Sequence, residues 1–262
     1  MLSHILFFRS IGERTCHCIE NIIANIVSMM MRGSEVKRMQ SNLDEYEGWG
    51  MEGIENSVRA RCGAQSRICG IDEVGRGALA GPVVAAAVIL NYDDIPSGIK
   101  DSKLLSASRR VVLSQALMQK ALVGIGESCV NEIDNINILQ ASLLAMTRAV
   151  KALPCAPDYA LVDGIHSPCG LYCPVQTVVG GDRSCIAIAA ASIVAKVFRD
   201  NLMAKLSQLY PEYGWCRNVG YGVKKHQEAL LKYGVTPHHR KSFRPVRFLV
   251  ATPPSDASEY KR

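Results

Sequence analysis

Two adjacent carboxylates close an apolar run near residue 70, and a glycine-rich turn follows them almost at once. The run ends in Asp72 and Glu73, and Gly75, Arg76 and Gly77 lie within the next four positions. Because adjacent side chains on a strand point to opposite faces, two acids that serve one site require the strand to end here. Glycine adopts backbone angles that other residues avoid, and it leaves main-chain N–H groups uncovered beside the guanidinium. This combination suits a metal ion that meets a phosphate.

The same glycines also fit the loose fingerprint of a dinucleotide-binding turn, which needs a strand before it and a helix after it. Residues 81–90 instead read GPVVAAAVIL, an apolar run that is opened by a proline and β-branched at both ends. Such a run predicts a second buried strand, so the turn would join a hairpin. Two carboxylates would also repel a pyrophosphate. We therefore do not expect a dinucleotide site.

From residue 67 onward, strand-like and helix-like segments alternate. Strands are predicted at residues 67–72, 83–90, 121–130, 159–162 and 175–179, and helices at residues 106–120, 133–153, 184–209 and 224–233. Ser106 is a suitable N-cap because its hydroxyl satisfies free amide donors of the first helical turn. This order implies an α/β fold with a mixed sheet and helices on its faces.

Two more acids lie where ligands gather in such folds. Asp163 ends one predicted strand, and Asp182 follows another and precedes the longest helix. Ligands in open α/β sheets collect at the carboxyl ends of strands, so these acids are expected to converge with the first pair. Clustered carboxylates need divalent cations, and oxygen-only ligands favour Mg²⁺ or Mn²⁺ over zinc. Taken alone, each of the two could also be a turn residue or a helix-capping acid.

These segments resemble, in the right order, the motifs of the type 2 ribonucleases H, the ribonuclease HII family. The shared motifs are residues 68–82, 101–105, 162–164, 181–182, 188–197, 220–222 with His226, and 239–243. The resemblance covers about residues 66–248. Each short motif is weak alone, and the ordered set is specific. It implies a ribonuclease H-like mixed sheet flanked by helices, with a small helical C-terminal region.

The resemblance implies a metal-dependent endonuclease that cuts the RNA strand of RNA–DNA hybrids. It also implies nicking on the 5′ side of ribonucleotides embedded in DNA, which leaves 3′-hydroxyl and 5′-phosphate ends. The cofactor would be Mn²⁺ or Mg²⁺, and two such ions about 3.5–4 Å apart can clamp the attacking and leaving oxygens. The catalytic and metal-binding residues would be Asp72, Glu73, Asp163 and Asp182.

Substrate contacts are implied in the same way. RNA differs from DNA by the 2′-hydroxyl, which the glycine-rich turn would read with backbone groups while Arg76 lies near the phosphate. Tyr221 matches the family position that stacks on the sugar of the following deoxynucleotide, and the basic candidates are phosphate contacts. The candidate substrate-binding residues are Gly75, Arg76, Gly77, Lys103, Lys196, Tyr221 and Arg240. His226 and His239 match family positions without an assigned role, and Gly181 stands where many relatives carry lysine.

Two rival functions differ from this reading in what they require. Another two-metal nuclease of the same fold, such as a resolvase, would keep the acids but would not need the glycine-rich turn together with Tyr221. A non-catalytic hybrid-binding protein would not need all four acids, and all four are present. Both rivals are therefore weaker.

Bulk properties agree with a nucleic-acid partner. The net charge is +6 and the isoelectric point is about 8.8, a mild bias that fits a polyanion. The ten cysteines are scattered, which indicates free thiols in a reducing compartment, and the Cys16-His17-Cys18 segment has no second ligand pair at zinc spacing. No apolar stretch approaches the roughly 20 residues that span a bilayer, and no secretory cleavage site follows the N-terminus. We expect a cytoplasmic monomer.

The ends of the chain carry no matching motif. Residues 1–65 are predicted to be an extension that is disordered or arises from a spurious start, because Met29, Met30, Met31, Met39 and Met51 are all conceivable starts. A partner-binding or substrate-binding appendage is the alternative. The catalytic domain is predicted at residues 66–248, and residues 249–262 are predicted to be a polar tail.

Overall fold

A computed structural model describes residues 53–251 of the chain, so the predictions for residues 1–52 and 252–262, including the Cys16-His17-Cys18 segment, lie outside the described part. The described strands form one sheet in the order β3-β2-β1-β4-β5. Their bounds are β1 Ile68–Val74, β2 Val83–Ile89, β3 Leu122–Ser128, β4 Tyr159–Asp163 and β5 Val175–Val178. The predicted strands are therefore confirmed, with β1 running two residues further than expected.

The sheet is mixed. Strand β1 pairs antiparallel with β2, and β2 pairs antiparallel with β3, whereas β1 with β4 and β4 with β5 are parallel. The glycine-rich turn thus joins a hairpin, as predicted, because a strand and not a helix follows it. Strand β1 lies at the centre, so its carboxyl end and that of its parallel neighbour β4 meet at one edge of the sheet.

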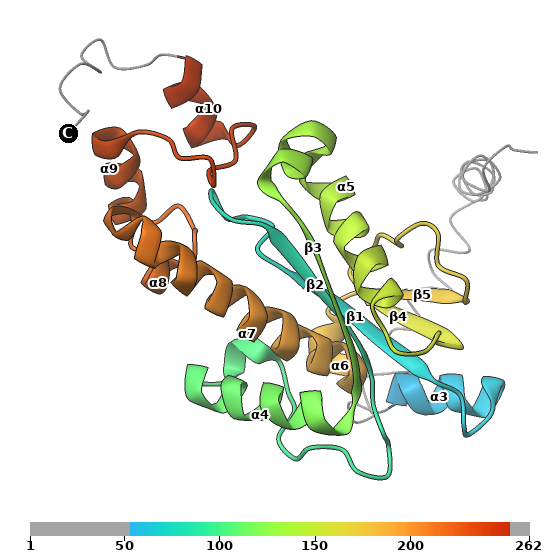
Figure 1. Cartoon of the computed structure of the whole chain (residues 1–262). Helices are drawn as coiled ribbons and strands as arrows, with labels where there is room; N and C mark the ends of the chain where they lie inside the picture. Colours follow the sequence, from blue (N-terminus) through green and yellow to red (C-terminus); the bar gives the residue numbers. More distant parts are fainter. Residues whose placement is uncertain (1–52, 252–262) are drawn as a thin grey trace, which may run out of the picture. The chain divides into compact units, whose positions relative to one another are not determined.

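Helices cover both faces of this sheet (Figure 1), which confirms the predicted α/β fold with a mixed sheet and helices on its faces. Helix α5 packs on one face, and α7 and α4 lie on the other. The helical bounds are α3 Gly53–Cys62, η1 Ser102–Leu104, α4 Ala107–Lys120, α5 Val130–Lys151, α6 Gly181–Ser184, α7 Ile186–Leu209, η2 Pro211–Tyr213, α8 Trp215–Asn218, α9 Lys224–Tyr233 and α10 Arg244–Ala251. No helix within residues 53–251 is long and apolar enough to cross a membrane.

Close contact between β1 and α7 depends on Gly70. A β-carbon at this position would lie 2.1 Å from the backbone carbon of Ala187, so only glycine lets the helix approach the central strand this closely. On the opposite face, apolar residues of β1 and β2 pack against α5 around Ile133, Ala145 and Met146. The central strand is therefore buried on both sides up to the two acids near its end.

Helix α3 lies inside the segment that was predicted to be an extension. Its Glu55 is fully buried and accepts hydrogen bonds from the backbone N–H of Ala187, at 2.9 Å, and from the thiol of Cys185, at 3.0 Å. Buried carboxylates are stabilised by such donors, and this one caps the start of α7. Helix α3 thus packs against the start of α7 although it lies before the predicted boundary at residue 66. The sequence of residues 53–62 has no clear helical periodicity of apolar residues, so this helix was not predicted.

The small helical C-terminal region is confirmed. Its core is an aromatic cluster in which the ring of Trp215 stacks on that of Tyr213, with the centroids 5.2 Å apart. Helix α10 continues to Ala251, three residues beyond the predicted end of the catalytic domain. The apolar residues of α7 that face this cluster tie the region to the main sheet.

Candidate active site

All four predicted acids line one pocket of about 280 Å³ at the carboxyl ends of β1 and β4. Parallel pairing of these strands explains the meeting, because it brings Asp72 and Asp163 to the same edge of the sheet. The remaining lining residues come from η1, α4, α7 and the loop before α9. The complete lining is Asp72, Glu73, Val74, Ser102, Lys103, Arg110, Asp163, Asp182, Ser192, Lys196 and Tyr221.

Asp72 and Glu73 both reach the pocket although they are neighbours on a strand. The ladder between β1 and β4 ends at Ile71, so the edge of β1 that faces β4 is unpaired from Asp72 onward. The opposite edge stays paired with β2 as far as Val74. Asp72 is 7% exposed and accepts a hydrogen bond from the backbone N–H of Glu73 at 2.7 Å. Burial raises the pKa of Asp72 well above its ordinary value, and the nearby charges of Glu73 and Asp163 raise it further.

The Glu73 carboxylate is held by the arginine of the glycine-rich turn. Its Oε1 accepts a hydrogen bond from Nη1 of Arg76 at 3.0 Å. Burial raises the pKa of Glu73, and the Arg76 guanidinium only partly offsets this effect. The predicted turn and the predicted acids therefore form one connected unit.

Asp163 and Asp182 are fixed by the start of helix α6. The backbone N–H of Gly181 donates to Oδ1 of Asp163 at 2.7 Å, and Gly180 holds the left-handed angle, φ 66°, that turns the chain into this helix. Burial raises the pKa of the Asp163 carboxyl. Asp182 is 5% exposed and forms an ion pair with Nζ of Lys103 at 2.8 Å.

The donor set fits a hard divalent cation. Four carboxylates share one pocket, and three of them have raised pKa values because burial and mutual repulsion disfavour their charged forms. Oxygen-only donors of this kind suit Mg²⁺ or Mn²⁺. In the present side-chain arrangement, no group of three Asp, Glu, His or Cys residues within residues 53–251 is placed so that it could hold a metal ion. Lys103 and Arg76 instead supply the positive charge beside Asp182 and Glu73.

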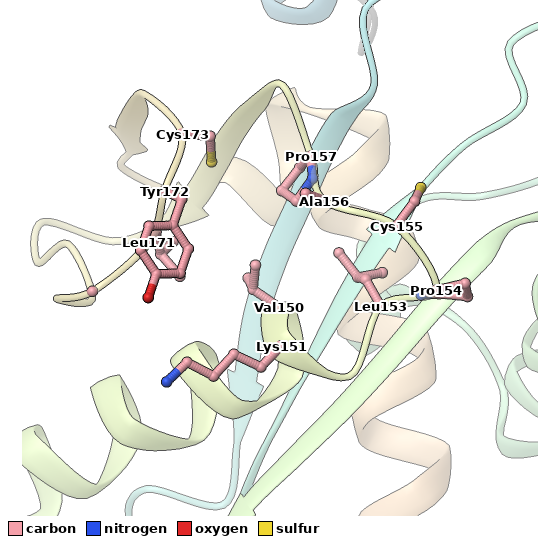
Figure 2. A pocket seen from close by; sticks show the side chains of 11 residues that line it. Val150, Lys151, Leu153, Pro154, Cys155, Ala156, Pro157, Leu171, Tyr172 and Cys173 are labelled. Carbon is pink, nitrogen blue, oxygen red and sulfur yellow. The ribbon is translucent and has the colours of Figure 1, made fainter.

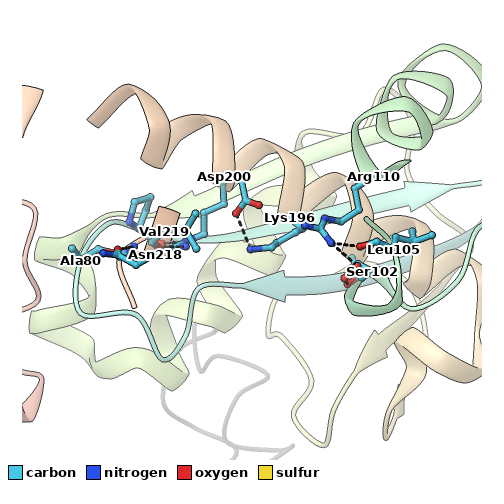
Figure 3. A network of polar contacts seen from close by, with 12 residues as sticks. Ala80, Ser102, Leu105, Arg110, Lys196, Asp200, Asn218 and Val219 are labelled. Carbon is cyan, nitrogen blue, oxygen red and sulfur yellow. Dashed lines mark hydrogen bonds and ion pairs between the residues drawn. The ribbon is translucent and has the colours of Figure 1, made fainter. Parts of the chain in front are cut away.

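Lys103 and Lys196 line the pocket, as expected for candidate phosphate contacts. Figure 3 shows Lys196 bonded to Asp200, one turn along α7, with Nζ 2.8 Å from Oδ1. Both lysines are therefore paired with acids, and the Lys103 side chain is 77% exposed.

Arg240 does not line the pocket. It is fully buried, and its guanidinium donates to the backbone carbonyls of Gly75, Arg76 and Gly81 at 2.7, 2.7 and 3.0 Å. Burial lowers the pKa of this guanidinium, and nearby Arg199 lowers it further. Its place differs from the predicted phosphate contact: Arg240 supports the glycine-rich turn from beneath, because the carbonyls of a tight turn need buried donors.

Arg199 is a second buried guanidinium, and it has no counterpart among the predicted site residues. It donates to the carbonyls of Ala80, Pro82 and Val219 at 3.1, 3.0 and 2.8 Å. Figure 3 shows the Ala80 and Val219 segments that it joins. Arg199 thus ties the segment after the glycine-rich turn to the one before Tyr221.

Tyr221 lines the same pocket and lies beside the turn. A β-carbon at Gly77 would lie 3.8 Å from Cε1 of the Tyr221 ring, and the Arg199 guanidinium carbon lies 5.8 Å from the ring centroid. The structure therefore brings together the two elements predicted to read the substrate, the glycine-rich turn and the tyrosine.

Three further polar residues of the pocket are absent from the predicted site residues, namely Ser102, Arg110 and Ser192. Ser192 donates a hydrogen bond that lowers the pKa of Asp72 against the effect of burial, and it also bonds Ser102 at 3.0 Å. Arg110 donates to the carbonyls of Ser102 and Leu105, as Figure 3 shows, and so fixes the η1 turn that carries Lys103. The sequence does contain an indication for Ser192, because it lies four residues before Lys196 in an otherwise apolar helical run. Residues four positions apart lie on the same face of a helix.

A larger cavity of about 330 Å³ lies at the opposite ends of β4 and β5 (Figure 2). Its lining is mostly apolar and includes Leu153, Leu171 and the fully exposed Tyr172, with Lys151 the one charged member. Carboxylates do not line this cavity, so the acid pocket is the better candidate for phosphodiester chemistry.

Comparisons with known proteins agree with the fold. A family model described as Ribonuclease HII matches residues 69–246. The chain is 55% identical over 199 residues to a ribonuclease HII of Ruegeria pomeroyi, a match that covers 75% of this chain and 85% of the relative.

Solved structures share the architecture. The ribonuclease H2 from Pyrococcus horikoshii OT3 is 27% identical and has a TM-score of 0.60, covering 70% of this chain and 96% of that one. A structure described as Bst-RNase HIII in complex with Mn²⁺ is 19% identical with a TM-score of 0.57, covering 71% and 70% of the two chains. The second likeness is one of fold alone.

Proposed function

The chain belongs to the ribonuclease HII family and is an endonuclease of the ribonuclease H type, and we propose that the four clustered acids form its catalytic metal site. The observation that carries this proposal is the meeting of Asp72, Glu73, Asp163 and Asp182 in one pocket. The family is metal-dependent, and the oxygen-only donor set favours Mg²⁺ or Mn²⁺ for this chain. When bound, two such ions supply electrostatic activation of water and of the phosphodiester.

The residues of the chain have separate tasks in this proposal. The acids would hold the cations and would not act as general bases themselves. Lys103 and Arg76, now paired with Asp182 and Glu73, turn toward substrate phosphates when cations take over the carboxylates. Lys196 adds a further positive charge on the α7 side of the pocket.

Ribonucleotide selection is assigned to the turn and to Tyr221. Backbone groups of Gly75, Arg76 and Gly77 read the 2′-hydroxyl, and the Tyr221 ring packs on the deoxyribose that follows the ribonucleotide. Their close approach supports this division, because a β-carbon added at Gly77 would lie 3.8 Å from Cε1 of the Tyr221 ring. Arg240 and Arg199 hold these two elements through backbone carbonyls.

The substrates we propose are RNA–DNA hybrids and DNA duplexes with embedded ribonucleotides, cut on the 5′ side of a ribonucleotide to leave 3′-hydroxyl and 5′-phosphate ends. A resolvase-like nuclease or a non-catalytic binding protein is not favoured, because the family consists of ribonucleases. We further propose that the protein works as a monomer in the cytoplasm and that its catalytic domain includes helix α3.

The test is cleavage of a duplex that carries one ribonucleotide, with an all-DNA duplex of the same sequence as the control. With Mg²⁺ or Mn²⁺, we expect one cut 5′ of the ribonucleotide and none in the control. A chelator should stop cleavage and leave hybrid binding largely intact. Equal cutting of both duplexes would contradict ribonucleotide selection, and cutting in excess chelator would contradict the metal site.

A further inference from the structure

A chain of buried hydrogen bonds lies beneath the loop that carries Tyr221. His226 and His239 are both fully buried, and their Nε2 atoms are 3.1 Å apart. Nε1 of Trp215 donates to the same Nε2 of His226 at 3.1 Å. The chain ends at the main chain of Tyr221, because Nδ1 of His226 lies 2.9 Å from its carbonyl oxygen.

The hydrogen-bond partners determine the proton on each imidazole. Nδ1 of His239 accepts from the backbone N–H of Thr236 at 3.0 Å, so the proton of neutral His239 lies on Nε2. Nε2 of His226 accepts from Nε1 of Trp215 and therefore carries no proton, and the Nε2–H of His239 faces this same acceptor at 3.1 Å. His226 is then protonated on Nδ1, where it donates to the Tyr221 carbonyl. Burial lowers the pKa of both imidazoles, in agreement with two neutral rings.

We propose that His226 is a positioning residue that sets the Tyr221 ring for ribonucleotide selection, and that His239 keeps His226 in the tautomer that can do so. This inference rests on the proposed role of Tyr221. The tyrosine is flanked by Gly220 and Gly222, and Gly220 adopts a φ of 87°. The glycines on both sides have no side chain that could hold the loop, so its geometry depends on the hydrogen bonds of its backbone.

Two such bonds converge on the Tyr221 carbonyl. One comes from the backbone N–H of Val223 at 2.9 Å and the other from His226 at 2.9 Å. The Val223 bond is local and moves with the loop, whereas His226 belongs to α9, whose Ala229 and Leu230 are buried in the C-terminal core. Its contact therefore joins the loop to α9, beside the bonds from the backbone N–H of Leu79 to Gly220 and from Arg199 to Val219 that hold the loop to the segment after the glycine-rich turn.

Two substitutions separate the contacts of His226. His226→Asn places an amide N–H near the Nδ1 position and keeps the donor to Tyr221, but it loses the acceptor for Trp215 and His239. His226→Gln does the reverse, because its carbonyl reaches the Nε2 position and no donor faces Tyr221. We expect the Gln variant to lose about two- to tenfold in kcat/KM at a single ribonucleotide, the factor that corresponds to one net hydrogen bond. The Asn variant should stay within about twofold of wild type, because it retains that bond.

A double-mutant cycle with Tyr221→Ala tests whether His226 acts through the ring. If it does, His226→Gln should cost nothing further once the ring is gone, because coupled residues are not additive. Tyr213→Phe is the matched control. It removes a hydrogen bond of similar length to a backbone carbonyl in the same cluster, from the Tyr213 hydroxyl to Gly234 at 3.0 Å, without contact to Tyr221. This control should lower the melting temperature and leave kcat/KM unchanged.

The outcomes are distinct. Multiplicative losses in the cycle, or a greater loss for His226→Asn than for His226→Gln, would overturn the inference while leaving the function of Tyr221 intact. If Tyr221→Ala itself has no effect on a folded protein, the proposed role of Tyr221 fails and the inference fails with it. Should the Gln variant not fold, the Asn variant alone decides, and a tenfold loss in folded His226→Asn would overturn the inference.

Discussion

Nη2 of Arg240 donates to the carbonyl oxygen of Gly75 at 2.7 Å, so a fully buried guanidinium supports a turn that lies 165 residues earlier in the chain. Nη1 of the same group donates to the carbonyl of Arg76 at 2.7 Å. A turn that presents bare N–H groups to a substrate exposes its carbonyls on the other side, and Arg240 satisfies two of them at once. The resemblance to the family named Arg240 as a phosphate contact, whereas its guanidinium lies on the backbone carbonyls of the turn.

Salt dependence distinguishes this role from a phosphate contact. Arg240→Lys offers one ammonium where three N–H groups now donate, so the turn should loosen and cleavage should fall by about tenfold or more, since an unsatisfied buried carbonyl costs about 1–3 kcal/mol. The slope of log binding against log salt should not change, because no phosphate contact is lost. Lys103→Gln is the comparison, and its slope should fall by about one. A shallower slope for Arg240→Lys would instead indicate that Arg240 contacts a phosphate.

Charge removal at the acids should separate cleavage from binding. Asp72→Asn or Asp163→Asn keeps side-chain size and removes one anionic oxygen, so cleavage should drop by more than about a hundredfold, since even outer partners of metal ligands cost 10–100-fold. Hybrid binding, which rests mainly on basic and backbone contacts, should largely survive. Both quantities can be measured on one labelled duplex. Near wild-type cutting by either variant would mean that the carboxylate is not a metal ligand.

The raised carboxyl pKa values predict how the metal-free protein responds to pH. Burial raises the pKa of Asp72, Glu73 and Asp163 above their unfolded values, so the folded state binds these protons more tightly than the unfolded chain. These three carboxyls should therefore contribute most to stability at acidic pH, and their contribution should fall as pH rises through their folded pKa values.

Thermal melts in chelator, from pH 5 to pH 8, test this sign. Asp72→Asn should flatten the fall and raise the melting temperature near neutral pH, by about 2–4 °C for each kcal/mol of repulsion and desolvation removed. Added Mg²⁺ should stabilise the wild type more than the variant, because only the wild type offers all four carboxylates. Equal pH profiles for the two proteins would contradict the burial of charge at Asp72.

The sequence predicted the elements whose physical cause is local. Apolar runs identified β1 and β2, the Ser106 cap identified the start of α4, and acids at strand ends identified the pocket. Properties that depend on distant partners were not predicted. Burial of Arg240 requires carbonyls of a turn 165 residues away, and the place of helix α3 requires Glu55 to meet the start of α7, 132 residues later. Neither residue carries a local pattern that distinguishes it from a solvated charge.

Helix α3 gives a direct test of where the working domain begins. A chain starting at Met51 retains Glu55 and should fold and cleave at close to the full-length rate. A chain starting at Ser66 loses the carboxylate that accepts from Ala187, so its melting temperature should fall. Glu55→Ala in the full chain should cost about 0.5–2 kcal/mol, as for other lost N-terminal caps. Glu55→Gln keeps an acceptor oxygen and should be nearly neutral. Full stability of the Ser66 chain would place α3 outside the domain.

Tyr221 allows ring stacking to be separated from catalysis. Packing on a sugar needs a flat ring and no charge, and stacking of this kind is worth about 1–3 kcal/mol, or roughly one to two powers of ten in rate if it is expressed in the transition state. Tyr221→Ala should therefore lower cleavage at a single embedded ribonucleotide by about that factor. Tyr221→Phe keeps the ring beside Gly77 and over Arg199, so it should lose much less. The check is kcat/KM on the duplex with one ribonucleotide. Equal damage from both changes would assign the effect to the hydroxyl, and damage from neither would leave the Gly75-Arg76-Gly77 turn as the sole reader of the 2′-hydroxyl.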